Sequence, residues 1–103
     1  MKKTERQINI EKLVAIRDSD TNTSAVRLQS IQTMQKLIEK EDPQTKKNIK
    51  VLKELRDSEA TGDGVRIQVI QTLQKILDLV EGEVKPNQPT FESIFSEIRG
   101  GKT

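Results

Sequence analysis

Two stretches of this 103-residue chain decide its fold: VRLQSIQTMQK at residues 26–36 and VRIQVIQTLQK at residues 65–75. The second stretch lies 39 positions after the first, and at the same spacing residues 9–42 align with residues 48–81 without a gap. The aligned segments share 14 identical residues in 34 positions, and most other pairs are chemically close. Self-similarity at such a period is typical of repeated supersecondary units. The chain therefore contains a tandem duplication of one unit.

Each unit has the pattern of two helices joined by a polar loop. The first unit begins with Thr4 and Gln7 at capping-box spacing, and the second with Asp42 before Pro43, where proline suits the first helical position. Apolar residues then recur with the period of an amphipathic helix. The expected helices cover about residues 4–17, 24–41, 43–56 and 64–80.

These patterns predict an all-α fold in which two tandem helical hairpins form one duplicated domain over residues 1–81, with repeats at 9–42 and 48–81. In the fourth helix the apolar residues spread over about half of the circumference, whereas the third helix has a narrower apolar face. We therefore expect the second helix of each unit to be the inner one, packed on more sides.

The C-terminal part is predicted to be a linker over residues 82–90, where Pro86 and Pro89 block helix continuation, and a short helix with a tail over residues 91–103. A helix this short is not stable alone. It therefore either folds back to cap the four-helix unit, or docks on a partner protein or a neighbouring subunit. Its apolar residues, the candidate partner-binding residues, are Phe91, Ile94, Phe95 and Ile98.

The composition argues against catalysis. The chain has no His, Cys, Trp or Tyr, which removes the commonest general base, the thiol nucleophile and the usual zinc ligands. Each interhelical loop carries an acidic pair: Asp18 with Asp20, and Asp57 with Glu59. These pairs can be interpreted as weak cation or acid–base sites, but we favour caps of the following helices. We therefore expect no enzyme activity, no cofactor, no metal and no small-molecule substrate.

The sequence also indicates a soluble protein. No apolar run reaches the roughly 18 residues of a membrane span, and residues 1–6 lead into no apolar signal segment. We expect a cytoplasmic location without membrane contact, in the host cytoplasm if the chain is viral.

Basic residues concentrate on the first helix of each unit, although the net charge is only +2. A lysine row is expected opposite the apolar face of the third helix, at Lys46, Lys50 and Lys53. One interpretation is a surface that contacts nucleic-acid phosphate, where each neutralised phosphate adds salt-dependent affinity; the other is an ordinary solvated face. The candidate nucleic-acid-binding residues are Lys2, Lys3, Arg6, Lys46, Lys47, Lys50, Lys53 and Arg56.

The second helix of each unit repeats a row of glutamines on its polar side. Glutamine pairs with base edges or with backbone amides of a partner, and it is otherwise a neutral helix former. A self-association interface is an intermediate interpretation, because glutamine tolerates burial between subunits better than lysine does. The candidate interface residues are Gln29, Gln32, Gln35, Gln68, Gln71 and Gln74.

The repeated stretch resembles the second helix of a HEAT repeat. Residues 26–37 and 65–76 both begin with the Val-Arg pair of that family, and in the first copy Ser30 is the small residue that follows. At Val69, valine replaces the alanine of the family pattern. The resemblance covers about 70 residues and implies a right-handed stack of helical hairpins that acts as a binding scaffold.

Residues 66–80 (RIQVIQTLQKILDLV) also resemble the helix that follows the DNA-binding part of phage small terminase subunits. That resemblance implies a ring assembly whose tail reaches the large motor subunit, although the chain is short for the family and shows no clear helix-turn-helix. The leading hypothesis is a non-catalytic assembly or adaptor protein of phage DNA packaging that binds nucleic acid and, through its C-terminal helix, a protein partner or another copy of itself. The alternative is a monomeric HEAT-like protein–protein interaction module without nucleic-acid binding.

Overall fold

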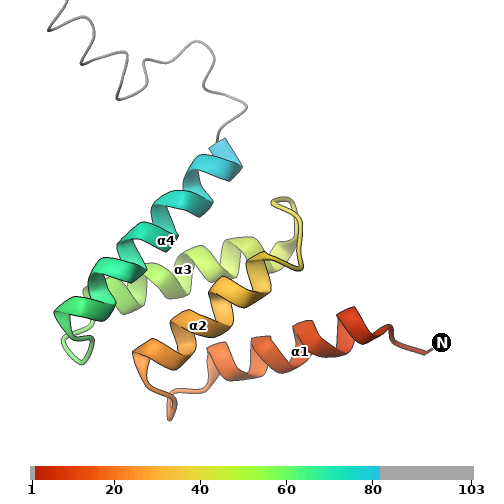
Figure 1. Cartoon of the computed structure of the whole chain (residues 1–103), viewed down its shortest axis with the longest axis horizontal. Helices are drawn as coiled ribbons and strands as arrows, with labels where there is room; N and C mark the ends of the chain where they lie inside the picture. Colours follow the sequence, from red (N-terminus) through yellow and green to blue (C-terminus); the bar gives the residue numbers. More distant parts are fainter. Residues whose placement is uncertain (1, 82–103) are drawn as a thin grey trace, which may run out of the picture.

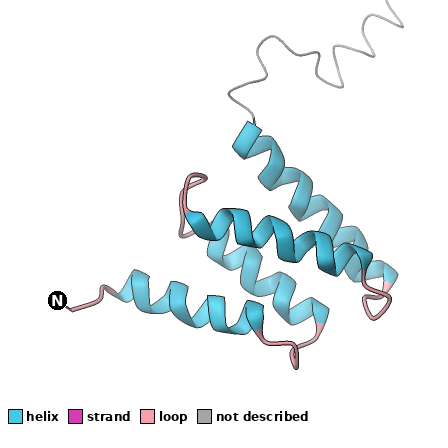
Figure 2. Ribbon diagram, turned by 180° about the vertical axis from the view of Figure 1, so that it is seen from behind, coloured by secondary structure: helices cyan, strands magenta, loops and turns pink. Residues whose placement is uncertain are grey.

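The chain folds into helical hairpins in a computed structural model that describes residues 2–81. Within this part there are four helices and no strand: α1 (Glu5–Asp18), α2 (Ser24–Gln35), α3 (Pro43–Asp57) and α4 (Asp63–Glu81) (Figure 1). The hairpins α1–α2 and α3–α4 have similar orientations (Figures 1 and 2). The predicted all-α class and its two hairpins are therefore confirmed. The expected linker over 82–90 and the expected helix within 91–103 lie outside the described residues.

Two of the helices begin at the caps that the sequence predicts. The Gln7 amide N–H donates to the Thr4 side chain at 3.1 Å, and the Thr4 N–H donates to the Gln7 side chain at 2.8 Å. At the start of α3 the Asp42 carboxylate accepts from the Gln44 N–H at 2.8 Å, with Pro43 in the first turn. Each cap satisfies a backbone donor that has no partner inside the helix.

The end of α2 differs from the prediction, because this helix ends at Gln35 rather than near Glu41. The N–H groups of Leu37 and Ile38 both donate to the carbonyl oxygen of Met34, at 2.8 and 3.1 Å, which closes the last turn. The chain then has to reverse before Pro43, and a residue that precedes proline is disfavoured in the helical region. At the position equivalent to Pro43 the second unit has Gly82, and α4 runs on to Glu81.

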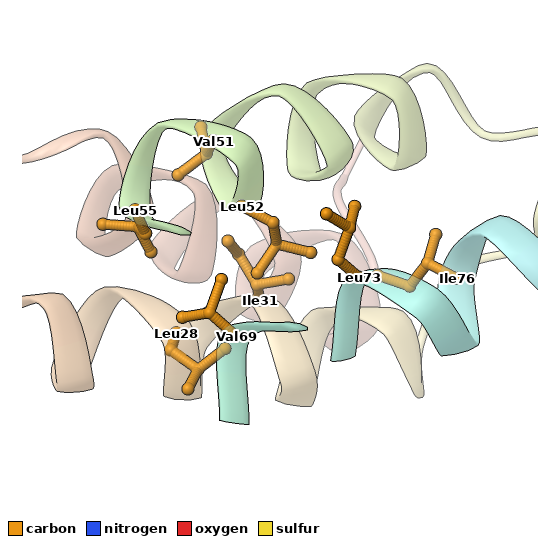
Figure 3. Close-up of a cluster of buried hydrophobic side chains, with 8 residues drawn as sticks. All are labelled: Leu28, Ile31, Val51, Leu52, Leu55, Val69, Leu73 and Ile76. Atoms are coloured by element: carbon orange, nitrogen blue, oxygen red, sulfur yellow. The ribbon is translucent and has the colours of Figure 1, made fainter. Parts of the chain in front are cut away.

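The hydrophobic core lies at the seam between the two hairpins. Its buried side chains come from α2, α3 and α4 and pack together in one cluster (Figure 3). The members are Leu28, Ile31, Val51, Leu52, Leu55, Val69, Leu73 and Ile76. The only fully buried residue of α1 is Arg17. The duplication thus builds its core between the repeats as well as within them.

The prediction that the second helix of each unit is the inner one holds for α2 but is wrong for α4. Helix α2 contacts α1, α3 and α4. Helix α4 instead exposes four large apolar residues, and no other described element covers them, because α4 is the last helix of residues 2–81. They are Ile67, Ile70, Leu79 and Val80.

Candidate interaction surfaces

A buried arginine connects the two hairpins. The Arg17 side chain is only 1% exposed, and its Nε and Nη2 donate to the two carboxylate oxygens of Asp18 at 2.8 and 3.0 Å. Its Nη1 donates to the side-chain oxygens of Gln44 and Asn48, both at 2.8 Å. Charge-assisted hydrogen bonds of this kind compensate the loss of hydration of a buried cation. Arg17 therefore connects the first hairpin to the second at the seam, a role that its sequence pattern did not indicate.

The equivalent residue of the second hairpin has the same local pairing and a different environment. Nε and Nη2 of Arg56 donate to the Asp57 carboxylate at 2.9 and 3.1 Å. The Arg56 side chain is 39% exposed, and among the described residues no third helical hairpin faces it. Identical local sequence thus produces a seam residue in one copy and a surface residue in the other.

Two of the four candidate acidic residues, Asp18 and Asp57, are the last residues of α1 and α3 and pair with these arginines. The favoured interpretation as a helix cap is therefore wrong for Asp18. The cap of α2 is Thr23, whose hydroxyl accepts from the Val26 N–H at 3.2 Å. The hydrogen bonds from Arg17 lower the pKa of Asp18, and those from Arg56 lower the pKa of Asp57. Within residues 2–81, no three or more acidic side chains gather in a way that could hold a metal ion.

A second pair of equivalent arginines holds the loops. The Arg27 Nε donates to the carbonyl oxygen of Arg17 at 2.6 Å, and the Arg66 Nε donates to that of Arg56 at 2.8 Å. Arg66 also donates to the carbonyl oxygen of Ser58 at 2.6 Å. Each guanidinium thereby satisfies carbonyl groups at the end of the preceding helix. The identity of the arginines in both repeats was the sequence signal for this role.

The candidate basic residues lie exposed on two different helices. On α3, Lys46, Lys50 and Lys53 lie opposite the buried side of that helix, whereas the exposed Lys47 lies at the edge of that side and acts electrostatically on Asp18. Lys2, Lys3 and Arg6 lie at the start of α1, where the Lys3 Nζ is 2.8 Å from a carboxylate oxygen of Glu11. Within the described part of the chain, Lys46, Lys50 and Lys53 form no ion pair.

The lysine row belongs to the second unit alone. Thirty-nine positions earlier, α1 has Gln7, Ile8, Glu11 and Val14 in place of the four lysines. The repeated fold therefore does not require lysine at these positions.

The glutamine row divides between the seam and the surface. The Gln32 Nε2 donates to the Thr72 hydroxyl at 3.0 Å, and the Gln35 Oε1 accepts from the Asn48 amide at 2.5 Å, so both contacts join the first hairpin to the second. The Gln74 Nε2 donates to the Asp78 carboxylate within α4, at 3.0 Å. The remaining candidate interface residues are exposed: Gln29, Gln68 and Gln71.

An open groove runs between α1 and α2 on the side away from the second hairpin. Apolar and small polar side chains line it. They are Leu13, Ile16, Val26, Gln29, Ser30 and Thr33.

None of the four described helices combines the length and the apolar character that a bilayer-spanning segment needs. Comparison with protein-family models, with curated proteins and with solved structures finds no match to the chain. The candidate partner-binding residues Phe91, Ile94, Phe95 and Ile98 lie outside the described residues, as does their expected helix.

Proposed function

We propose that the chain is a non-catalytic adaptor protein that binds nucleic acid through the exposed lysines of α3. The observation that carries this proposal is that Lys46, Lys50 and Lys53 form a row without an ion pair among residues 2–81. A row of free ammonium groups on a rigid helix suits the phosphate backbone, since each phosphate contact releases a counterion. The absence of these lysines from the equivalent helix α1 supports a role beyond folding.

The non-catalytic part of the proposal rests on the side-chain chemistry of the whole chain. No histidine or cysteine is available as a base or nucleophile. Two of the loop carboxylates, Asp18 and Asp57, are engaged by neighbouring arginines, whose hydrogen bonds hold them in the ionised form. These groups are suited to electrostatic pairing rather than to proton transfer near neutral pH.

We propose DNA packaging as the context of this adaptor, because residues 66–80 resemble phage small terminase subunits. Double-stranded DNA is therefore the first nucleic acid to test. The proposed location follows from that context and is the cytoplasm, in the host cell if the chain is viral. The proposed protein partner, or second copy, binds through Phe91, Ile94, Phe95 and Ile98.

The test compares two triple variants of equal charge. Lys46→Gln/Lys50→Gln/Lys53→Gln removes the row on α3, whereas Lys12→Gln/Lys36→Gln/Lys75→Gln removes three exposed lysines elsewhere. Binding of a labelled DNA duplex is measured by fluorescence anisotropy over a range of salt concentrations. We expect the α3 variant to bind more weakly and its log–log salt dependence to be shallower by roughly 2 to 3. Equal losses in both variants would show that α3 is not the binding surface.

The exposed apolar residues of α4 favour a second candidate function, a HEAT-like module that binds a protein and has no affinity for nucleic acid. Ile67 and Ile70 lie on the α4 surface, and exposed apolar side chains grouped on one helix are typical of protein contacts. The same anisotropy titration separates the two functions. If the unmodified chain does not bind the duplex at low salt, the nucleic-acid proposal fails and the protein-binding module stands.

A further inference from the structure

The contacts of the seam use two complementary surfaces, one from each hairpin. On the first hairpin, Arg17, Gln32 and Gln35 provide polar groups, and Leu28 and Ile31 provide apolar ones. We call this set, together with Ser24, the leading side. The second hairpin provides the partners, which we call the receiving side: Gln44, Asn48, Leu52, Leu55, Thr61 and Thr72.

Because the chain is a duplication, it carries each surface a second time. The leading side returns 39 positions later on the outer surface of the second hairpin, as Arg56, Asp63, Ile67, Ile70, Gln71 and Gln74. The receiving side occurs 39 positions earlier on the first hairpin, as Glu5, Asn9, Leu13, Ile16, Asn22 and Thr33. Three of these, Leu13, Ile16 and Thr33, line the open groove between α1 and α2.

The apolar residues of both surfaces are buried in the seam, but their equivalents at the two ends of the molecule are more exposed. Leu28 and Ile31 are 2% and 0% exposed in the seam, whereas their equivalents Ile67 and Ile70 are 57% and 47% exposed. Leu55 is buried, whereas its equivalent Ile16 is exposed. Within residues 2–81, each end of the molecule thus exposes a surface equivalent to one side of the seam, and no described element covers it.

The polar chemistry of these two ends is also complementary. The seam contact of Gln32 with Thr72 corresponds to Gln71 with Thr33, which are the same residue types. The contact of Gln35 with Asn48 corresponds to Gln74 with Asn9, again the same types.

The arginine contact of the seam would gain an anionic acceptor if the equivalent residues of two copies met. In the seam, Arg17 donates to the neutral side chains of Gln44 and Asn48. The equivalent Arg56 would face Asn9 and the carboxylate of Glu5, which replaces a neutral acceptor by an anionic one.

We propose that a second copy of this chain docks head to tail on the first, with the outer surface of α4 of one copy seated against α1 and α2 of the next. Such an interface is heterologous, so it propagates into an open filament or closes into a ring. The surface on α1 and α2 differs from the receiving side of the seam at two neighbouring positions. There the charged Arg6 and Lys12 stand in the places of the buried Thr45 and Val51. The association between copies is therefore weaker than the seam inside one chain.

A charge exchange at the ends tests this proposal in the full chain. The mass in solution is measured by sedimentation over a range of protein concentrations, and we expect it to rise above the mass of one chain. Arg56→Glu alone and Glu5→Arg alone place like charges against each other, so each variant is expected to remain monomeric. An equimolar mixture of the two restores opposite charges and should associate again. The matched control Glu54→Arg, which changes an exposed residue of α3 outside both sides, should associate like the unmodified chain.

Cross-linking places the contact at the expected residues. The chain has no cysteine, so Thr33→Cys and Gln71→Cys each introduce a single thiol. A mixture of these two variants, treated with a short bis-maleimide, should give a covalent dimer. The control is one chain that carries both Gln32→Cys and Thr72→Cys, the equivalent seam pair, and it should cross-link within the chain.

Two results would overturn the proposal. One is an unmodified chain that stays monomeric at all concentrations, together with no cross-link between residues 33 and 71. The other is association that appears only when Phe91→Ser and Phe95→Ser are combined, because residues 91–98 of the same chain would then be the occupant of the α4 surface. Neither result affects the DNA titration of the lysine variants, so the proposed function and this proposal fail separately.

Discussion

At the scale of single residues, Arg17 and Arg56 show how one side chain acquires two roles. Both bind the aspartate that follows them, with donor–acceptor distances between 2.8 and 3.1 Å. Among the described residues only Arg17 is covered by another hairpin, in which the side-chain oxygens of Gln44 and Asn48 accept hydrogen bonds from its Nη1. The difference comes from the neighbouring repeat, so the sequence around each arginine could not predict it.

The two arginines should therefore contribute unequally to stability. Arg17→Met leaves the buried Asn48 and the partly buried Gln44 without their donor, and we expect the free energy of unfolding to fall by about 2–4 kcal/mol. Arg56→Met removes a surface pair and should change stability little. Urea unfolding of both variants, at a concentration where the chain is monomeric, measures the difference. Equal losses of unfolding free energy in the two variants would contradict the role of Arg17 in connecting the two hairpins.

Acid should weaken the fold through Asp18. Hydrogen bonds from Arg17 lower the pKa of Asp18 in the folded chain, so the unfolded chain binds more protons than the folded one as the pH falls. The stabilisation from Asp18 is then complete above its unfolded pKa of about 3.9 and is lost as the pH falls through the lowered folded pKa. Asp18→Asn should be less stable than the unmodified chain at pH 7, and the gap should narrow on acidification. Asp20→Asn, whose side chain does not bind Arg17, is the charge-matched control, and a gap that persists in acid would refute this account.

At the scale of helices, local signals predicted where α1 and α3 begin but not where α2 ends. The capping box of Thr4 and Gln7 and the Asp42-Pro43 pair are satisfied within a few residues, so their outcome depends on local sequence. Leu37 and Ile38 continue the apolar helical pattern beyond Gln35, as their equivalents do in α4. The end of α2 is instead set by the need to turn into α3, which is a demand of the tertiary structure.

Equivalent leucines in α1 and α3 offer a matched test of where the core lies. Leu52 is fully buried in the seam, whereas its equivalent Leu13 is half-buried beside the open groove. Leu52→Ala should cost about 2–5 kcal/mol of unfolding free energy, because it leaves a cavity in a close-packed cluster. Leu13→Ala should cost less than half as much. Thermal or urea unfolding measures both, and a larger loss at Leu13 would place the core elsewhere.

At the scale of the whole molecule, stability should be uneven along the chain. Helix α1 has one buried residue and packs mainly on α2, whereas α3 has five buried residues and lies in the core. Native-state hydrogen exchange should therefore show faster exchange for the amides of α1 than for those of α3. Protection of α1 that increases with protein concentration would further indicate a partner on the groove between α1 and α2. Equal protection of α1 and α3 in the monomer would contradict the arrangement of the core.

The duplication and the all-α class were predictable because they depend on residue types at fixed spacing. The candidate surfaces were predictable only in part. The lysines of α3 are exposed as their pattern indicates. Gln32 and Gln35, by contrast, form hydrogen bonds within the seam. The roles of Gln44 and Asn48 arise only from their contact with Arg17. Contacts between repeats depend on which helix lies opposite, and a single repeat does not contain that information.

The repeated seam also has a consequence for protein engineering, because the number of hairpins is not set by the contacts. Residues 24–62 begin at the start of α2 and end just before α4. A second copy of this segment inserted after residue 62 keeps the 39-residue register. In the new middle hairpin, Ser30, Met34 and Leu37 of the inserted α2 take the places of Val69, Leu73 and Ile76 of α4. The chain can thus be lengthened in steps of one hairpin, and the positions to adapt in each added hairpin are the few at which α2 and α4 carry different core residues.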